Sequence, residues 1–185
     1  MKKIPDAMRR AREGWTNRGE RRPPGAPAPG PGQESVWDYP RPPAIVPCPR
    51  RVRVEFAGET VADTRHAVKV CETASPPTYY VPPGDVREDL LVPVGRRTLC
   101  EWKGQARYWS LRVGDRVAEA AVWAYPEAWG PFDRIAGWYA FMPAAMDACW
   151  VGDDRVRAQA GGFYGGWITP DVLGPFKGEA GTGHW

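Results

Sequence analysis

The chain has 185 residues, a formal net charge of +3, ten tryptophans and four cysteines. This length predicts one domain, or one domain with terminal arms, and is enough to bury a core. The charge is uneven: residues 1–22 carry eight Lys or Arg against three Asp or Glu, so the remaining residues together have a net charge of −2. We therefore do not expect a basic nucleic-acid platform, although a basic arm can still contact phosphates.

Targeting and redox signals are weak. The segment before Trp15 is basic but has no apolar run, so it lacks the hydrophobic region of a secretory signal. No later segment is apolar for long enough to span a bilayer, so we expect a cytoplasmic protein without membrane contact. Cys48, Cys71, Cys100 and Cys149 are scattered, and no C-x-x-C pair suggests structural zinc. We expect free thiols and no metal site, and the sequence identifies no cofactor or oligomeric state.

Composition divides the chain into three parts. Residues 1–49 form a basic, Pro/Gly-rich N-terminal arm, in which a short helix is expected between Ile4 and Trp15. The prolines and glycines of residues 21–49 cannot form a strand ladder, so this segment is expected to be a linker or a strap laid over the domain. Residues 50–151 form the domain itself. Residues 152–185 form a Gly-rich C-terminal arm, whose segment 161–166 is expected to be flexible.

Alternation of apolar and polar residues predicts a mainly β domain. Val52, Val54 and Phe56 alternate with polar residues, and Gly58 turns the chain into a return strand over residues 60–62. A second hairpin is expected over residues 105–125, around Gly114. Further strands are expected over residues 68–72, 78–81, 98–100, 138–142 and 147–151. The sequence thus predicts two small antiparallel sheets, short helical turns and extended arms.

Two local expectations concern irregular points. Asp85 is expected to cap a helical turn that extends to Leu90, and Pro93 is expected to end that turn. In the second hairpin, alternation places Leu111 on the apolar side of its strand and Ser110 on the polar side.

Three ordered motifs carry a family resemblance. The first is Pro76-Pro77-Thr78-Tyr79-Tyr80-Val81-Pro82, the second runs from Thr98 to Tyr108, and the third from Ala121 to Tyr125. They resemble the patterns P-P-T-Y-Y-x-P, T-x-C-x-x-K-G-x-A-x-Y and A-W-x-Y of the bacterial "domain of unknown function 427" family, over residues 50–151. Two departures are visible, Glu101 where proline often follows the cysteine and Val122 inserted before Trp123.

The resemblance implies a β-tent fold, similar to that of methionine sulfoxide reductase B and related zinc proteins. Because this chain lacks their paired cysteines, a metal-free β-tent is implied. The family is also catalogued as nucleotidyltransferase-like. This chain lacks the Asp-x-Asp pair and the glycine-serine phosphate turn on which metal-assisted nucleotidyl transfer relies.

The polar and aromatic side chains of these motifs, with one carboxylate upstream, predict a small-molecule pocket. Lys103 beside Gly104 offers a cation at a loop where the backbone can approach a ligand. The expected ligand-binding residues are Glu72, Thr78, Tyr80, Thr98, Cys100, Lys103, Tyr108, Trp123 and Tyr125. The alternative reading is that Lys103 and Glu72 form a structural ion pair and that the tyrosines bridge core and solvent.

Three functions stay open, because no standard catalytic signature is present. The first is a domain that binds a small polar or anionic molecule through Lys103 and the tyrosines. The second is an enzyme, either one that uses Cys100 as nucleophile or redox thiol beside Lys103, or a nucleotidyltransferase as the family label suggests. The third is a module that recruits protein or nucleic acid through its basic N-terminal arm.

Overall fold

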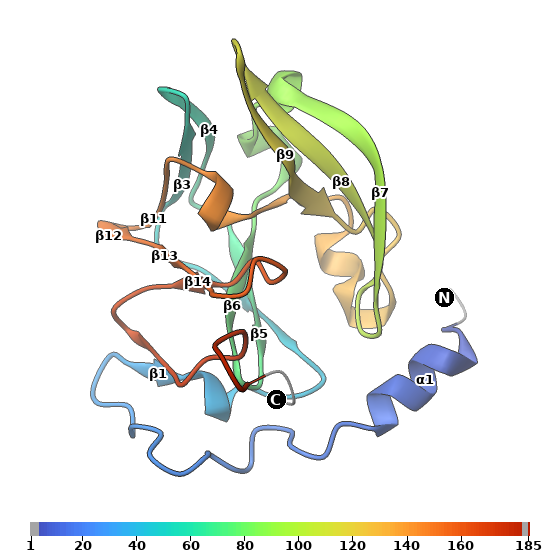
Figure 1. Ribbon diagram of the computed structural model, residues 1–185, viewed down its shortest axis with the longest axis vertical. Coiled ribbons are helices and arrows are strands. Elements are labelled where there is room, and N and C mark those ends of the chain that lie inside the picture. The colour runs from blue at the N-terminus through green and yellow to red at the C-terminus, as the bar shows by residue number, and fades with distance from the viewer. Residues whose placement is uncertain (1–3, 183–184) are drawn as a thin grey trace.

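The computed structural model describes residues 4–182 and 185, and it confirms the mainly β fold class. The outermost residues of both expected arms, 1–3 and 183–184, lie outside the described part. In the other residues there are three sheets and two short strand pairs where the sequence predicts two sheets. Figure 1 shows the sheets spread around β5 and β6, with the N-terminal segment running beneath them.

The largest sheet carries most of the motif residues. It has the order β10-β9-β8-β7 and is antiparallel throughout. Its strands are β7 (Leu91–Cys100), β8 (Gly104–Val113), β9 (Arg116–Ala124) and β10 (Ala140–Phe141). The β7–β8 and β8–β9 connections are tight turns, so the second and third motifs lie on neighbouring strands.

The second sheet has the order β12-β11-β3-β4, and the third has the order β2-β5-β6. Their strands are β3 (Val52–Phe56), β4 (Glu59–Thr64), β11 (Ala148–Val151), β12 (Asp154–Arg155), β2 (Ala44–Pro47), β5 (Val68–Glu72) and β6 (Ser75–Tyr80). The first motif therefore begins in strand β6.

The terminal segments add two strand pairs. β1 (Glu34–Ser35) lies parallel to β15 (Val172–Leu173), and β13 (Arg157–Ala158) lies antiparallel to β14 (Trp167–Ile168). Helix α1 spans Asp6–Glu13, within the range where the sequence predicts a helix. Five 3₁₀ turns complete the described elements: η1 (Val36–Asp38), η2 (Pro83–Asp85), η3 (Glu88–Leu90), η4 (Gly130–Ile135) and η5 (Pro143–Ala145).

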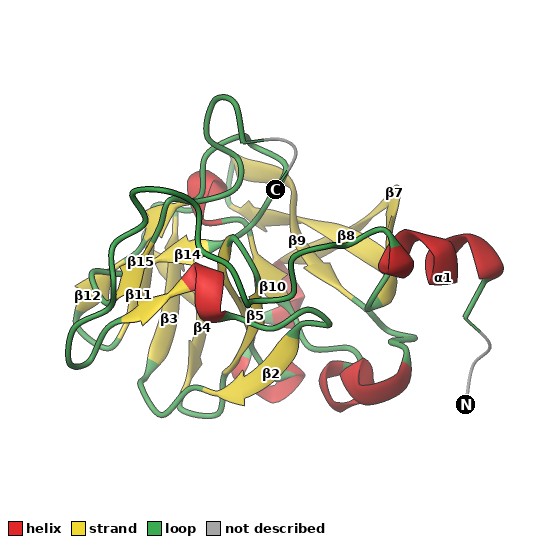
Figure 2. Ribbon diagram, turned by 90° about the horizontal axis from the view of Figure 1, so that it is seen from below, coloured by secondary structure: helices red, strands yellow, loops and turns green. Residues whose placement is uncertain are grey.

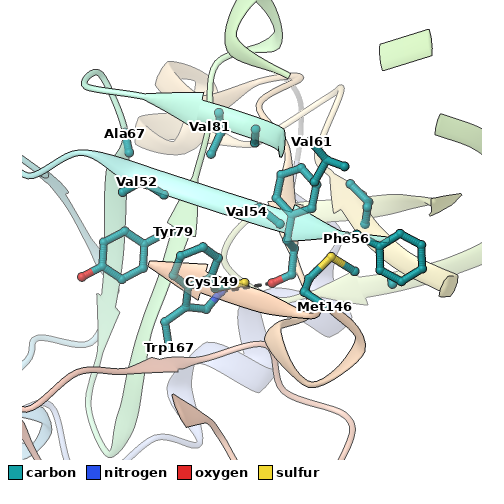
Figure 3. Close-up of a cluster of buried hydrophobic side chains, with 14 of the residues drawn as sticks. Val52, Val54, Phe56, Val61, Ala67, Tyr79, Val81, Met146, Cys149 and Trp167 are labelled. Carbon is teal, nitrogen blue, oxygen red and sulfur yellow. Dashed lines mark hydrogen bonds between the residues drawn. The ribbon is translucent and has the colours of Figure 1, made fainter. Parts of the chain in front are cut away.

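The main core lies between the sheets and includes a residue from the C-terminal segment (Figure 3). The inward residues of β3, Val52 and Val54, are fully buried, as their alternation predicts. Trp167 is also fully buried, packs on Tyr79 with ring centroids 5.0 Å apart, and donates from Nε1 to the Phe141 carbonyl at 3.1 Å. The segment that the sequence assigns to an arm therefore supplies part of the core.

The two terminal segments also pack on each other. Trp37 is 4% exposed and donates from Nε1 to the Pro175 carbonyl at 2.9 Å, inside a cluster that contains Val36, Val172 and Phe176. In Figure 2 the N-terminal segment crosses the molecule as a strap and reaches α1 at the end of the β7–β8 hairpin. Of the helices in the described ranges, none is both long enough and apolar enough to cross a membrane.

Two local predictions are wrong, and a third is incomplete. Asp85 does not cap a helix, because its carboxylate accepts a hydrogen bond from the Thr64 hydroxyl and η3 has no side-chain cap. Pro93 lies inside β7, which tolerates proline because β7 is an edge strand and one side of it makes no ladder. Ser110 is on the side of β8 that alternation makes polar, but it is buried. β9 bulges opposite it, and the Ser110 hydroxyl donates to the Glu119 carboxylate at 2.7 Å and accepts from the Ala120 N–H at 3.0 Å.

Candidate functional site

One cavity of about 270 Å³ lies between β5, β6 and the sheet of β7, β8 and β9. The structure places all nine of the expected ligand-binding residues in its lining: Glu72, Thr78, Tyr80, Thr98, Cys100, Lys103, Tyr108, Trp123 and Tyr125. Three of these are buried and six are half-buried. The three motifs are therefore brought together around one hollow.

Strand geometry explains why the aromatic residues converge. Trp123 and Tyr125 are two residues apart, so their side chains leave β9 and the residue after it on the same face. Tyr108 of β8 is directly opposite Trp123 in the ladder, and the two ring centroids lie 6.5 Å apart. The hydroxyl of Thr98 lies 2.9 Å from that of Tyr108, so β7 and β8 present linked hydroxyls to the cavity.

Lys103 is held at the turn between β7 and β8 by its neighbours. Gly104 has φ +102°, and a Cβ there would lie 3.1 Å from the Trp129 indole. Only glycine fits both the backbone angle and the packed ring, which explains the Lys-Gly pair of the motif. The Lys103 Nζ lies 5.7 Å from the Tyr125 ring centroid and 6.0 Å from that of Phe132, so aromatic faces surround the ammonium group.

Charge in the cavity is fixed by burial and by the neighbouring acidic groups. Burial disfavours the charged form of Lys103, but the Cys100 thiol and then the Tyr125 hydroxyl outweigh this and raise the pKa of Lys103 well above its ordinary value. Burial also raises the pKa of Tyr80 to about 12, although the Lys103 charge opposes that shift. At neutral pH the site thus presents an ammonium group and protonated phenols, which are all hydrogen-bond donors.

The predicted alternative, an ion pair between Lys103 and Glu72, is not what the structure shows. The Glu72 carboxylate accepts from Arg41 Nε at 3.1 Å, and Arg41 also donates from Nη2 to the Thr73 carbonyl at 2.8 Å. The side chain of Arg41 is 3% exposed and that of Glu72 is 21% exposed. Within the described residues, Lys103 has no carboxylate within 4 Å, so its charge is not neutralised by a direct partner.

Sequence reasoning missed a second part of the lining, which comes from the terminal segments. Trp15, Gln159, Phe163, Tyr164, Gly165 and Lys177 all line the cavity. No periodicity or motif marks them, because they lie in segments without regular strands. Among them, the aromatic Trp15 within a basic arm was the one visible sign of docking.

Trp15 is held beside the cavity by Glu101, the residue at which the second motif departs from the family pattern. Its Nε1 donates to the Glu101 carboxylate at 2.9 Å, and Arg12 donates from Nε to the Glu101 carbonyl at 2.7 Å. The guanidinium of Arg41 lies 3.9 Å from the Trp15 ring centroid. The carboxylate that replaces proline therefore fixes the N-terminal segment beside the cavity.

The end of the Gly-rich segment, at Gly165 and Gly166, is buried, whereas Gly161, Gly162 and Phe163 are exposed. A Cβ on Gly165 would lie 2.1 Å from Cη2 of Trp123, so the backbone of this segment rests directly on the indole that lines the cavity. Only glycine allows so close an approach. The expectation of a flexible segment did not take this backbone-to-ring packing into account.

A larger and more open hollow of about 580 Å³ lies elsewhere, beside β3 and β12. Arginines line it, but Arg50 pairs with Asp154, Arg51 with Asp63, and Arg53 with Glu55. These internal pairs account for most of its charge. It contains none of the motif residues, so the smaller cavity is the better candidate site.

The family match covers the part of the chain that carries the expected site residues. The model of the family described as "Domain of unknown function (DUF427)" matches residues 44–152, which is more than half of the chain and includes all nine expected site residues. No curated protein matches the chain. Trp15 and the C-terminal part of the cavity lining fall outside the matched range. The chain belongs to the DUF427 family.

Proposed function

We propose that the cavity binds a small polar or anionic molecule, with Lys103 as the central cation and the tyrosine hydroxyls as additional donors. The observation that carries this proposal is the charge balance of the site. Glu72 is held by Arg41, whereas the half-buried Lys103 has aromatic neighbours and, within the described residues, no carboxylate within 4 Å. An ammonium group that lies among aromatic rings without a carboxylate partner leaves its donors for water or for an anionic ligand in the cavity.

The size of the cavity supports a small ligand. About 270 Å³ is just below the range of roughly 300–1,000 Å³ that is usual for ligand pockets. This favours a metabolite of a few carbons over a nucleoside triphosphate. In the described part of the chain, no three His, Cys, Asp or Glu side chains gather in a way that could hold a metal ion. The nucleotidyltransferase reading therefore has less support than anion binding.

A thermal-shift experiment tests the proposal with acetate, succinate, citrate, sulfate and phosphate as probes. A probe at 100 times its dissociation constant adds about 2.7 kcal/mol of stability. At this chain length that raises the midpoint by roughly 5–11 °C. Lys103→Met should abolish the shift, whereas Arg112→Met, which removes an exposed cation of β8 outside the cavity, should leave it unchanged. The proposal fails if no anion stabilises the protein or if Lys103→Met binds as well as the wild type.

The second candidate is thiol chemistry at Cys100. Of the four cysteines, Cys48, Cys71 and Cys149 are buried, whereas Cys100 is half-buried and lines the cavity beside Lys103. A neighbouring ammonium group stabilises a thiolate. Iodoacetamide should then modify Cys100 in the folded protein, and Cys100→Ser should remove that modification. A folded protein whose Cys100 resists alkylation while the cavity still admits anions would leave binding as the only function.

Recruitment through the basic arm has the least support. Arg12, Arg22 and Arg41 all make contacts within the molecule, to Glu101 and Trp102 carbonyls, to Asp38 and to Glu72. These contacts favour a structural role of the arm over nucleic-acid binding. A cytoplasmic location remains our expectation for a protein with this function.

A further inference from the structure

A second ammonium group, that of Lys177, lies in the cavity. Lys177 belongs to the C-terminal segment outside the family match, and it is nine-tenths buried. Its backbone is fixed at both polar atoms: its N–H donates to the Ala74 carbonyl at 2.8 Å, and its carbonyl accepts from Gln159 Nε2 at 2.7 Å. The fold therefore holds this side chain in the cavity lining.

The surroundings of Lys177 are aromatic. Its Nζ lies 4.9 Å from the Trp15 ring centroid and 5.4 Å from that of Tyr164. Within the described residues it has no carboxylate within 4 Å. Burial lowers the pKa of Lys177, and the Glu72 carboxylate partly offsets this. Cation–π contact gives this ammonium group no hydrogen-bond acceptor, so its donors are left for water or for a ligand in the cavity.

The two carboxylates of the lining are already engaged. Glu72 accepts from Arg41, and Glu101 accepts from the Trp15 indole. Each carboxylate therefore has less capacity left for an amino group of a ligand than a carboxylate without a protein partner. The cavity thus presents two ammonium groups without a carboxylate within 4 Å in the described residues, and two carboxylates that already accept from the protein, which favours an anionic ligand over a zwitterion.

The two ammonium groups occupy different parts of the cavity. Lys103 comes from the β7–β8 turn and contacts Tyr125 and Phe132, whereas Lys177 comes from the C-terminal segment and contacts other rings. A monoanion would balance the charge of only one of them. We propose that the ligand is a small dianion, with two anionic groups at separate ends of a short skeleton, one bound by Lys103 and the other by Lys177. This inference rests on the proposed function and extends it to a ligand class.

Isothermal titration calorimetry tests the inference with matched probes. Dicarboxylates from malonate to adipate are compared with monocarboxylates of the same chain length, and 3-phosphonopropionate distinguishes a phosphonate end from a carboxylate end. A hydrogen bond to a charged group predicts that the best-fitting doubly charged probe binds about 10-fold tighter or more than its singly charged counterpart. Lys177→Met should remove this advantage and change monocarboxylate affinity by less than about 2-fold.

Three further variants make the result decisive. Lys177→Arg keeps the charge and should keep part of the preference for doubly charged probes, which separates a charge effect from a packing effect. Lys103→Met should weaken both classes of probe, and Arg112→Met should weaken neither. Circular dichroism and the thermal midpoint verify that each variant is folded.

The outcomes separate this inference from the function on which it rests. If mono- and dicarboxylates bind equally and Lys177→Met has no effect while Lys103→Met abolishes binding, the dianion inference is wrong and the proposed function stands. If no probe of either class binds the folded wild type, both are wrong.

Discussion

The contact between Arg41 and Glu72 offers the sharpest test of how the N-terminal segment supports the cavity. Arg41→Met keeps an apolar stem but removes the donors to Glu72 and to the Thr73 carbonyl, which lie at 3.1 and 2.8 Å from their acceptors. It also removes the guanidinium that lies 3.9 Å from the Trp15 ring. The remaining Glu72 carboxylate would have no direct cationic partner.

The cost follows from burial. Removing one member of a buried ion pair typically costs 3–5 kcal/mol, because a charge stays behind in a poorly solvated place. Glu72 keeps 21% side-chain exposure, and its charge acts on both Lys103 and Lys177, which softens the penalty. We therefore expect the lower end, about 3 kcal/mol. At this chain length the thermal midpoint should fall by roughly 6–12 °C.

Thermal unfolding followed by circular dichroism measures the effect against two comparisons. Arg22→Met removes a surface pair with Asp38 from the same segment and should hardly move the midpoint. Arg41→Met combined with Glu72→Gln should recover at least half of the loss, because no unpaired carboxylate remains. In the anion titrations, Arg41→Met alone should also weaken binding, since the released carboxylate competes for the ammonium groups. A midpoint equal to that of Arg22→Met, or a double variant no better than Arg41→Met, would refute the reasoning.

Two further predictions concern packing and pH. Gly165→Ala places a Cβ 2.1 Å from the Trp123 ring and should lower the free energy of unfolding in urea by about 1–3 kcal/mol. A Cβ on Gly84 would have no heavy atom within 4 Å, so Gly84→Ala should lower it much less. Equal losses in the two variants would contradict the packing of Gly165 on the indole. The second prediction uses the pKa of the Tyr80 hydroxyl, which burial raises from 10.0 to about 12. Above pH 10 the unfolded chain therefore loses this proton before the folded protein does. The free energy of unfolding then falls as the pH rises toward 12. Compared with Tyr80→Phe, the wild type should lose up to about 2.7 kcal/mol between pH 9 and pH 12, and parallel pH profiles of the two proteins would contradict the burial of this hydroxyl.

The sequence predicts the inner part of the cavity because the relevant information is local. Alternation along a strand decides which side chains share a face, so Trp123 and Tyr125 had to point the same way, and hairpin pairing brought Tyr108 beside them. The same logic did not predict the burial of Ser110, which lies opposite a bulge in β9 and bonds to Glu119 and Ala120 there. Alternation cannot reveal such a bulge, since it depends on how both strands fit the core.

The outer part of the cavity could not be predicted in this way. Lys177 and Tyr164 follow no period, and the backbone of Lys177 is held by Ala74, which lies about 100 positions earlier in the chain. The proline-rich strap was predicted, but not the place where it docks. That place depends on pairs of distant residues, such as Trp37 with Pro175 and Arg41 with Glu72, whose contacts no spacing rule encodes.

The family match covers the inner part of the cavity lining but not the outer part. The matched residues 44–152 contain Lys103, Tyr80 and Trp123, so the family match covers the inner cation and the aromatic wall of the cavity. Lys177 and Trp15 lie outside it, and with them the second cation and the ring beside it. If the ligand is a dianion, its second anionic group is therefore recognised by residues outside the family match. Family membership thus covers only the proposed Lys103 site, and the proposed second site has to be tested in this chain through Lys177.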